Sequence, residues 1–241
     1  SSAASDVYKR QLQCYAAIVH VRYSTTGASM PYNIQPLKVY FDGGNLALSH
    51  NGNLTNAGQL RANLAKEGAV FNTTVDSEVV LTLIAYSARP TIEERVAEAV
   101  NQIKGAFAIL LMTDNKIIAV RDPYGFRPLV LGKMENGWCV ASESCAFDLV
   151  GAELVRDVKP GEMIIIDSDN SEPRSMMWAE NKPAKPAHCI FEYVYFARND
   201  SIIDNQSVYD ARIQMGRELA KETPDIHPVS YTHLRAHETE A

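Results

Sequence analysis

The segment His50-Asn51-Gly52-Asn53-Leu54 combines residue types that could stabilise negative charge on a substrate. It follows the apolar run Leu46-Ala47-Leu48, so we expect Asn51 and Gly52 at the end of a strand, free of any ladder. The Asn51 side-chain amide and the Gly52 backbone N–H would then be neighbouring donors for an oxyanion that forms on a carbonyl. The alternative is a tight turn without chemistry, because Asn-Gly is the most common dipeptide in such turns.

Two charged residues could complete a site of this kind. Arg22, in the segment His20-Val21-Arg22-Tyr23-Ser24-Thr25-Thr26-Gly27, is expected at the end of a strand, where its planar guanidinium could bind a carboxylate. Asp76 begins a helix and could bind an ammonium group. Each also has a structural alternative, a salt bridge for Arg22 and a helix N-cap for Asp76. Together with Asn51 and Gly52, the two charges describe a site for free glutamine.

Strands and helices must position these residues. Residues 16–19 form an apolar run that predicts a buried strand leading to Arg22. Residues 55–66 predict a helix capped by Thr55, and residues 76–87 predict a helix with one apolar face. Thr91-Ile92-Glu93-Glu94 has the spacing of a capping box and begins a further helix, which Gly105 ends.

From there to about residue 167 the sequence predicts strands only. Residues 107–112 and 116–120 flank Thr113-Asp114-Asn115 and predict a hairpin. Further strands are predicted over residues 129–131, 138–141 and 162–166. A last helix is expected over residues 208–219. Helices in one block and hairpins in another are typical of an α+β fold with a largely antiparallel sheet.

Composition excludes several classes of protein. With 241 residues, of which 46% are hydrophobic and 22% charged, the chain is long enough for a sizeable globular core. The net charge of −6 argues against a nucleic-acid partner, and no apolar run is long enough for a membrane span. The cysteines are too widely spaced for a zinc site or a disulfide framework, which favours a cytoplasmic location.

Several segments, in order along the chain, resemble a known family. Residues 20–27, 50–54 and 75–78 are similar to the glutamine-binding motifs of class II, or N-terminal-nucleophile, glutamine amidotransferases. Within that class, four further segments are similar to the amidophosphoribosyltransferases: residues 121–129, 141–144, 158–162 and 191–198. The resemblance covers roughly residues 14–225.

This resemblance implies a fold and a reaction. The fold is a four-layer αββα sandwich of two antiparallel sheets between helices. In the reaction, a cysteine thiolate attacks the glutamine amide, and ammonia leaves as a thioester forms. Arg22, helped by Thr25, would hold the carboxylate of glutamine and Asp76 its ammonium group, while Asn51 and Gly52 would form the oxyanion hole.

The resemblance also implies what the complete enzyme does. Ammonia would aminate phosphoribosyl diphosphate in a second domain, with magnesium, to give 5-phosphoribosylamine in the first step of purine biosynthesis. The complete enzyme is expected to be a homo-oligomer without a nucleic-acid or membrane partner.

The sequence departs from the family at both ends. The family's nucleophile is the first residue of the mature chain, and no cysteine opens this sequence, so we expect the fragment itself to be inactive. Cys14 is interpreted as a core thiol, not as a substitute. Residues 14–205 would be a partial amidotransferase domain that lacks its N-terminal strand. Residues 206–226 would lead into an absent phosphoribosyltransferase domain, and residues 1–13 and 227–241 would be extraneous flanks.

Cys189 has two interpretations. Some family members hold a 4Fe–4S cluster, and Cys189 stands where one of its ligands falls, three residues before Glu192. Other members keep a plain cysteine there without a cluster. The remaining ligands would lie beyond residue 225, so no cofactor is expected in this chain alone.

Other functions and roles stay open. The chain could be a non-catalytic glutamine-binding or scaffold module that has lost its N-terminal cysteine, or an amidotransferase with a sugar phosphate as acceptor. We interpret Arg121, Asp122 and Arg127 as an ion-paired turn, not as ligand contacts. His20 and His50 are interpreted as structural hydrogen bonders.

Overall fold

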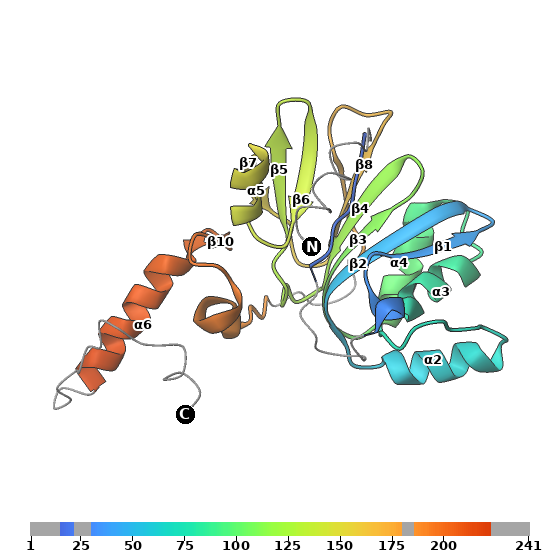
Figure 1. Ribbon diagram of the computed structural model, residues 1–241, viewed down its shortest axis with the longest axis horizontal. Helices are drawn as coiled ribbons and strands as arrows, with labels where there is room; N and C mark the ends of the chain where they lie inside the picture. Colours follow the sequence, from blue (N-terminus) through green and yellow to red (C-terminus); the bar gives the residue numbers. More distant parts are fainter. Residues whose placement is uncertain (1–14, 22–29, 180–185, 223–241) are drawn as a thin grey trace.

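The computed structural model describes residues 15–21, 30–179 and 186–222. Its largest feature is a six-stranded antiparallel sheet in the order β1-β2-β3-β4-β8-β9 (Figure 1). The strands are β1 (Leu37–Phe41), β2 (Gly44–Leu54), β3 (Gly105–Met112), β4 (Lys116–Arg121), β8 (Glu162–Asp167) and β9 (Arg174–Met177). The predicted hairpin around Thr113-Asp114-Asn115 is confirmed as the connection between β3 and β4.

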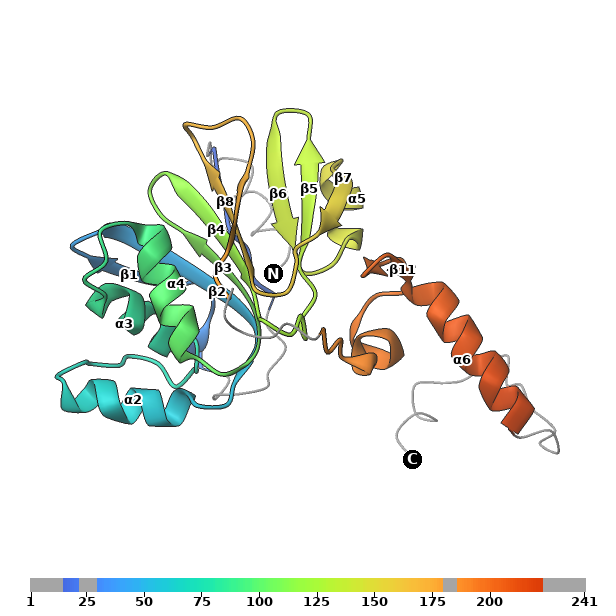
Figure 2. The same ribbon diagram turned by 180° about the vertical axis from the view of Figure 1, so that it is seen from behind.

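Three helices cover one face of this sheet: α2 (Ala57–Lys66), α3 (Glu78–Tyr86) and α4 (Ile92–Gln102) (Figures 1 and 2). Ile109 and Leu111 of β3 point toward them, because alternate residues of a strand face the same side. Val79 and Ile84 of α3 are fully buried in the same core, which confirms the predicted apolar face of that helix.

A second antiparallel sheet packs on the opposite face. It consists of β5 (Val130–Met134), β6 (Gly137–Ala141) and β7 (Glu153–Asp157), in the order β6-β5-β7. Ala108 and Ala119 of the larger sheet meet Leu131 of the smaller one in a separate core. Because β3 and β4 are covered on both faces, their sequences read as nearly continuous apolar runs. The expected α+β class with antiparallel sheets is confirmed.

Helix α5 (Cys145–Val150) contradicts the prediction of strands alone up to residue 167. Its Phe147 side chain lies against Gly132 of β5, so α5 covers part of the smaller sheet. The helix is too short to display a clear helical period, and Gly151 ends it in the left-handed conformation, with φ of 66°. Its apolar residues therefore resemble those of a short strand.

The C-terminal part of the described chain forms a smaller unit. It contains the π-helical turn η2 (Glu192–Phe196), the two-stranded ribbon β10 (Ile202–Ile203) and β11 (Gln206–Ser207), and α6 (Val208–Glu222). Tyr193, Ile203 and Val208 form its core. Helix α6, predicted from its apolar spacing, projects away from the two sheets (Figures 1 and 2).

The predicted buried strand over residues 16–19 is wrong. The described residues 15–21 belong to no helix or strand, and Val19 and Val21 are 75% and 92% exposed. An apolar run forms a buried strand only where a hydrogen-bonding neighbour and a covering layer meet it. No described strand pairs with this segment.

The two predicted helix caps have opposite outcomes. Thr91 caps α4 in a complete capping box with Glu94, as predicted. Thr55 does not cap α2, whose N-cap is Asn56. Instead, the backbone N–H and the hydroxyl of Thr55 both donate to the carbonyl of Lys104, at 2.8 and 3.2 Å, just before β3. The hydroxyl that the local pattern assigned to the helix N-terminus is therefore used in a contact with Lys104, which is distant in sequence.

We expect Thr91→Ala to lower the free energy of unfolding by about 0.5–2 kcal/mol, because the N–H of Glu94 loses its side-chain acceptor. Urea denaturation of the chain measures this change. Thr55→Ala is the matched control and should cost less, since its exposed hydroxyl satisfies no helix N–H. Equal losses in the two variants would contradict the capping assignment.

Candidate functional site

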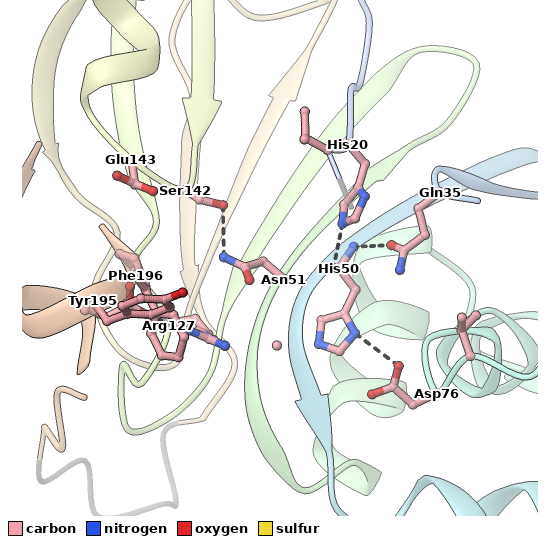
Figure 3. A pocket seen from close by; sticks show the side chains of 15 residues that line it. His20, Gln35, His50, Asn51, Asp76, Arg127, Ser142, Glu143, Tyr195 and Phe196 are labelled. Atoms are coloured by element: carbon pink, nitrogen blue, oxygen red, sulfur yellow. Dashed lines mark hydrogen bonds and ion pairs between the residues drawn. The ribbon is translucent and has the colours of Figure 1, made fainter. Parts of the chain in front are cut away.

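A cavity of about 600 Å³ lies where the two sheets and η2 meet (Figure 3). It is lined by three of the residues that the sequence nominated: Asn51, Gly52 and Asp76. Asn51 and Gly52 come from β2, and Asp76 lies two residues before α3. The fold thus brings the predicted oxyanion donors and the predicted ammonium ligand into one cavity.

Arg22 and Thr25 lie outside the described residues. Val21, which precedes Arg22, lines the cavity. The predicted roles of Arg22 and Thr25 stay predictions.

The predicted position of Asn51 and Gly52 needs correction. They lie within β2, which continues to Leu54, and they pair with Ala108 and Phe107 of β3. They therefore do not lie beyond the end of a strand, they are not free of a ladder, and they do not form a tight turn. The pairing with β3 continues because that strand is long enough to reach Leu54.

The opposite edge of β2 explains how these residues still border a cavity. The ladder between β1 and β2 ends at the pair of Leu37 and Leu48. Beyond that pair, side chains meet the edge of β2: the N–H of His50 donates to Gln35 Oε1 at 2.7 Å, and His20 Nε2 lies 3.1 Å from the carbonyl of His50. In the described part of the chain, no strand covers this edge next to Asn51 and Gly52.

Gly52 has a backbone conformation that other residues rarely adopt. Its φ is 144°, and a Cβ atom built there would lie 2.0 Å from the carbonyl oxygen of Ala106 and 2.9 Å from His50 Nε2. Both the conformation and the space therefore require glycine at this position. The chain can approach β3 closely here and still leave the cavity open.

The Asp76 carboxylate binds β2 and does not cap α3. Its Oδ2 accepts from the N–H of Leu54 at 2.8 Å, and its Oδ1 accepts from the hydroxyl of Ser77 at 3.2 Å. The N-cap residue of α3 is Ser77, so the alternative role of Asp76 as a helix cap is wrong. Its carboxylate is instead fixed at the wall of the cavity.

The environment of Asp76 favours its charged form. Burial alone would raise the pKa of Asp76, but hydrogen bonding with His50, the charge of His50 and the N–H of Leu54 outweigh it. The pKa of Asp76 therefore lies below its ordinary value. At neutral pH the cavity holds a carboxylate that can bind an ammonium group.

His50 connects Asp76 to β2. Its Nδ1 lies 2.9 Å from the hydroxyl of Ser77 and 3.7 Å from Asp76 Oδ1 (Figure 3). Its Nε2 is buried without a hydrogen-bond partner in the described chain. The contacts of His20 and His50 agree with their interpretation as structural hydrogen bonders.

Sequence reasoning missed the far wall of the cavity. That wall includes Arg127, Ser142, Glu143, Glu192, Tyr195 and Phe196. These residues belong to segments that carry the family resemblance, but their patterns contain no chemical signal of a shared site. Only the packing of the smaller sheet and η2 against β2 brings them together.

The turn that contains Arg121 and Asp122 has the predicted structural role. Arg121 is 1% exposed and donates to the carbonyls of Arg127 and Val158, at 2.8 and 2.7 Å. Burial raises the pKa of Asp122 even though four backbone N–H groups donate to it. Arg127 does form an ion pair, at 2.6 Å with Glu192, but it also lines the cavity, which was not predicted.

The cysteines lie apart from this cavity. None is among the described residues that line it, and Cys14 lies outside the described chain. Burial raises the pKa of the Cys139 and Cys145 thiols, which disfavours the nucleophilic thiolate. Cys189 is half-buried, and no group of His, Cys, Asp and Glu in the described chain is arranged to hold a metal. The role of Cys189 as an iron–sulfur ligand in the complete enzyme stays a prediction, because its expected partners lie beyond residue 225.

Comparison with known proteins decides the family. A model of the glutamine amidotransferase domain matches residues 20–148. The chain belongs to the glutamine amidotransferase domain family. The matched region contains Asn51, Gly52 and Asp76.

The relatives of this amidotransferase domain include amidophosphoribosyltransferases. The chain is 45% identical over 215 residues to amidophosphoribosyltransferase 1, chloroplastic, from Arabidopsis thaliana, covering 89% of this chain and 37% of that protein. It is 43% identical over 208 residues to the amidophosphoribosyltransferase of Bacillus subtilis, covering 86% and 43%. The chain thus spans about two fifths of the length of these relatives.

Solved structures agree with this relationship. The glutamine phosphoribosylpyrophosphate amidotransferase from B. subtilis, complexed with ADP and GMP, matches with a TM-score of 0.78 and 42% identity, over 84% of this chain and 43% of that one. A structure described as the allosteric regulatory enzyme of purine biosynthesis matches with a TM-score of 0.81 and 42% identity, over 86% of this chain and 44% of that one.

None of the helices in the described ranges has the length and hydrophobicity that a bilayer crossing requires.

Proposed function

We propose that this amidotransferase domain binds glutamine and forms the glutaminase part of an amidophosphoribosyltransferase. The observation that carries the proposal is the cavity in which Asn51, Gly52 and Asp76 meet, although Asp76 is distant from the other two in sequence. The Asp76 carboxylate suits the ammonium group of glutamine, and the donors of Asn51 and Gly52 suit its side-chain carbonyl. Arg22, with Thr25, would bind the carboxylate at the other end of the backbone.

In the proposed reaction, a cysteine thiolate attacks the carboxamide carbon of glutamine. The carbonyl oxygen becomes an oxyanion, which accepts from the Asn51 amide and the Gly52 N–H. By resemblance to the family, the free α-amine of that cysteine takes the thiol proton and passes it to the leaving nitrogen. When the C–N bond breaks, ammonia leaves and a glutamyl thioester remains, which water hydrolyses to glutamate and the free thiol. The cysteine lies outside the described residues and is assigned to an N-terminal position by resemblance alone.

The acceptor is the finer part of the proposal. Identity to amidophosphoribosyltransferases over most of this chain supports phosphoribosyl diphosphate as the acceptor of ammonia, in a further domain. The four-layer N-terminal-nucleophile fold is likewise proposed, supported by the order of helices, two sheets and α5. Magnesium is predicted for the complete enzyme only, and a 4Fe–4S cluster with Cys189 as one ligand is one of the two alternatives for that enzyme.

The direct test is glutamine binding by Asp76→Asn. We expect the variant to weaken glutamine affinity by about 10- to 100-fold, because a charge-assisted hydrogen bond is worth about 1.5–3 kcal/mol. Asparagine keeps an oxygen for the N–H of Leu54, so the bond from β2 to residue 76 is retained. Calorimetry measures affinity in this chain, and KM for glutamine measures it in the complete enzyme, whose ammonia-dependent synthesis should persist.

Asp42→Asn is the matched control, since it removes an exposed carboxylate that pairs only with Arg95 among the described ion pairs. It should bind glutamine like the parent chain. Because the pKa of Asp76 is lowered from 3.8, affinity should not decline through its titration until the pH falls below that value. Unchanged affinity in Asp76→Asn would contradict the proposal, whereas binding without hydrolysis by the complete protein would favour a non-catalytic glutamine-binding module.

A further inference from the structure

One contact joins the proposed oxyanion donor to the smaller sheet. Asn51 Nδ2 donates to the hydroxyl oxygen of Ser142 at 3.3 Å, across 91 residues of sequence. Asn51 belongs to the six-stranded sheet, and Ser142 directly follows β6 of the three-stranded sheet. Figure 3 shows this bond at the wall of the cavity, on the side away from His50 and Asp76.

The bond leaves the proposed chemistry of Asn51 intact. A carboxamide nitrogen carries two hydrogens, so one can bind Ser142 while the other is available to an oxyanion. A free carboxamide would rotate about its side-chain torsions and would have to be ordered when the oxyanion forms. Ordering a group in advance is what makes an oxyanion donor effective.

Ser142 is itself anchored from the other side. The neighbouring Glu143 Oε2 accepts from the hydroxyl of Ser201 at 2.6 Å and from the N–H of Arg198 at 2.8 Å. The hydroxyl of Ser144 accepts from the N–H of Ile202 at 2.7 Å. Three consecutive residues thus connect Asn51 with the segment of residues 198–202, which runs from just after η2 to the first residue of β10.

Two of the three anchoring bonds have a charged acceptor, and the bond between Asn51 and Ser142 has none. Glu143 is a carboxylate, and hydrogen bonds to a charged acceptor are roughly twice as strong as neutral ones. Ser201 is 1% exposed and Ser144 is 8% exposed, so water competes little for these partners. The position of Ser142 is therefore set by the C-terminal segment as well as by β6.

We propose that Ser142 is a positioning residue that orients the Asn51 amide for glutamine hydrolysis, and that Glu143 and Ser144 hold it in place. This inference rests on the proposed function of the cavity. It gives Ser142 no contact with substrate: its effect passes through Asn51. It also makes the geometry of the oxyanion donor depend on the segment of residues 198–202.

The test compares turnover with binding for Ser142→Ala. In the complete enzyme, we expect the turnover number for glutamine hydrolysis to fall about 2- to 10-fold, the equivalent of one neutral hydrogen bond. KM for glutamine should not change, because Asp76 and the predicted carboxylate ligand are untouched. Ser168→Ala, an exposed serine after β8, is the matched control and should match the parent in both parameters.

A double-mutant cycle separates positioning from general damage. In an Asn51→Ala background, Ser142→Ala should have no further effect on turnover, because the amide that it orients is gone. Independent, multiplying effects of the two changes would overturn the inference. If Asn51→Ala itself left turnover unchanged, the proposed function of the cavity would fail instead, so the two failures are distinguishable.

A spectroscopic measurement tests the contact in this chain without activity. The side-chain amide signals of Asn51 should shift in the ¹⁵N spectrum of Ser142→Ala, and should shift in the same sense when Glu143→Gln weakens the anchor. Calorimetry should show unchanged glutamine affinity in both variants. Unchanged Asn51 signals in Ser142→Ala would overturn the proposed role.

Discussion

Replacing Asn51 by alanine is expected to lower the turnover number for glutamine hydrolysis by about 10²–10³-fold, the usual effect of removing one oxyanion-hole donor. The Asn51 amide would act on the oxyanion and much less on the neutral carbonyl of bound glutamine, so KM should change little. The measurement is ammonia release by the complete enzyme. Synthesis from added ammonia should persist, because it does not use this site.

Two results would separate this role from a structural one. Asn101→Ala, in which an exposed asparagine of α4 loses only bonds outside the cavity, should retain full turnover. A rise in KM without a fall in turnover would make Asn51 a ground-state ligand. That outcome would contradict the oxyanion assignment.

Gly52→Ala is expected to damage both folding and activity. The new methyl group would overlap the Ala106 carbonyl, and a φ of 144° is strained for any other residue. Strain and overpacking together should lower the free energy of unfolding by at least about 2 kcal/mol. Urea denaturation measures the loss, and amide hydrogen exchange should show it first in the ladder between β2 and β3.

Gly58→Ala provides the matched control. This glycine lies in α2, and no atom stands within 4 Å of the Cβ that alanine would add. The substitution should be neutral or stabilise the chain by up to about 1 kcal/mol, because alanine favours the helix. If Gly52→Ala unfolded at the same urea concentration as the parent, the close approach of β2 to β3 would not hold in solution.

Sequence patterns predicted correctly those features that depend only on residues close together in the chain. The capping box of Thr91 and the hairpin after β3 need only neighbouring residues, and both are confirmed. The apolar face of α3 was predictable for the same reason. The predictions for Thr55 and residues 16–19 failed because their outcome depends on distant partners. Thr55 donates to the carbonyl of Lys104, and no described strand pairs with residues 16–19.

Some residues of the candidate site were predictable from the sequence, and others depend on contacts between distant segments. Asn51, Gly52 and Asp76 were predicted from residue type, spacing and resemblance, and they line one cavity. Ser142 and Arg127 lie in segments that showed only resemblance, because their place in the cavity depends on how the second sheet packs. The ladder partners of Asn51 and Gly52 were missed because an Asn-Gly pair usually ends a strand, whereas β3 here extends to pair with both.

The early end of the β1 ladder has a consequence for how this site tolerates change. β1 begins at Leu37, so the N–H of His50 donates to a side chain, Gln35 Oε1, and not to a backbone carbonyl of a strand. Insertions at the hairpin tip, around residues 42–43, fall at the far end of β1 and should leave the pocket unaltered. Loss of the Gln35 side chain would instead leave the N–H of His50 without this acceptor at the wall of the cavity.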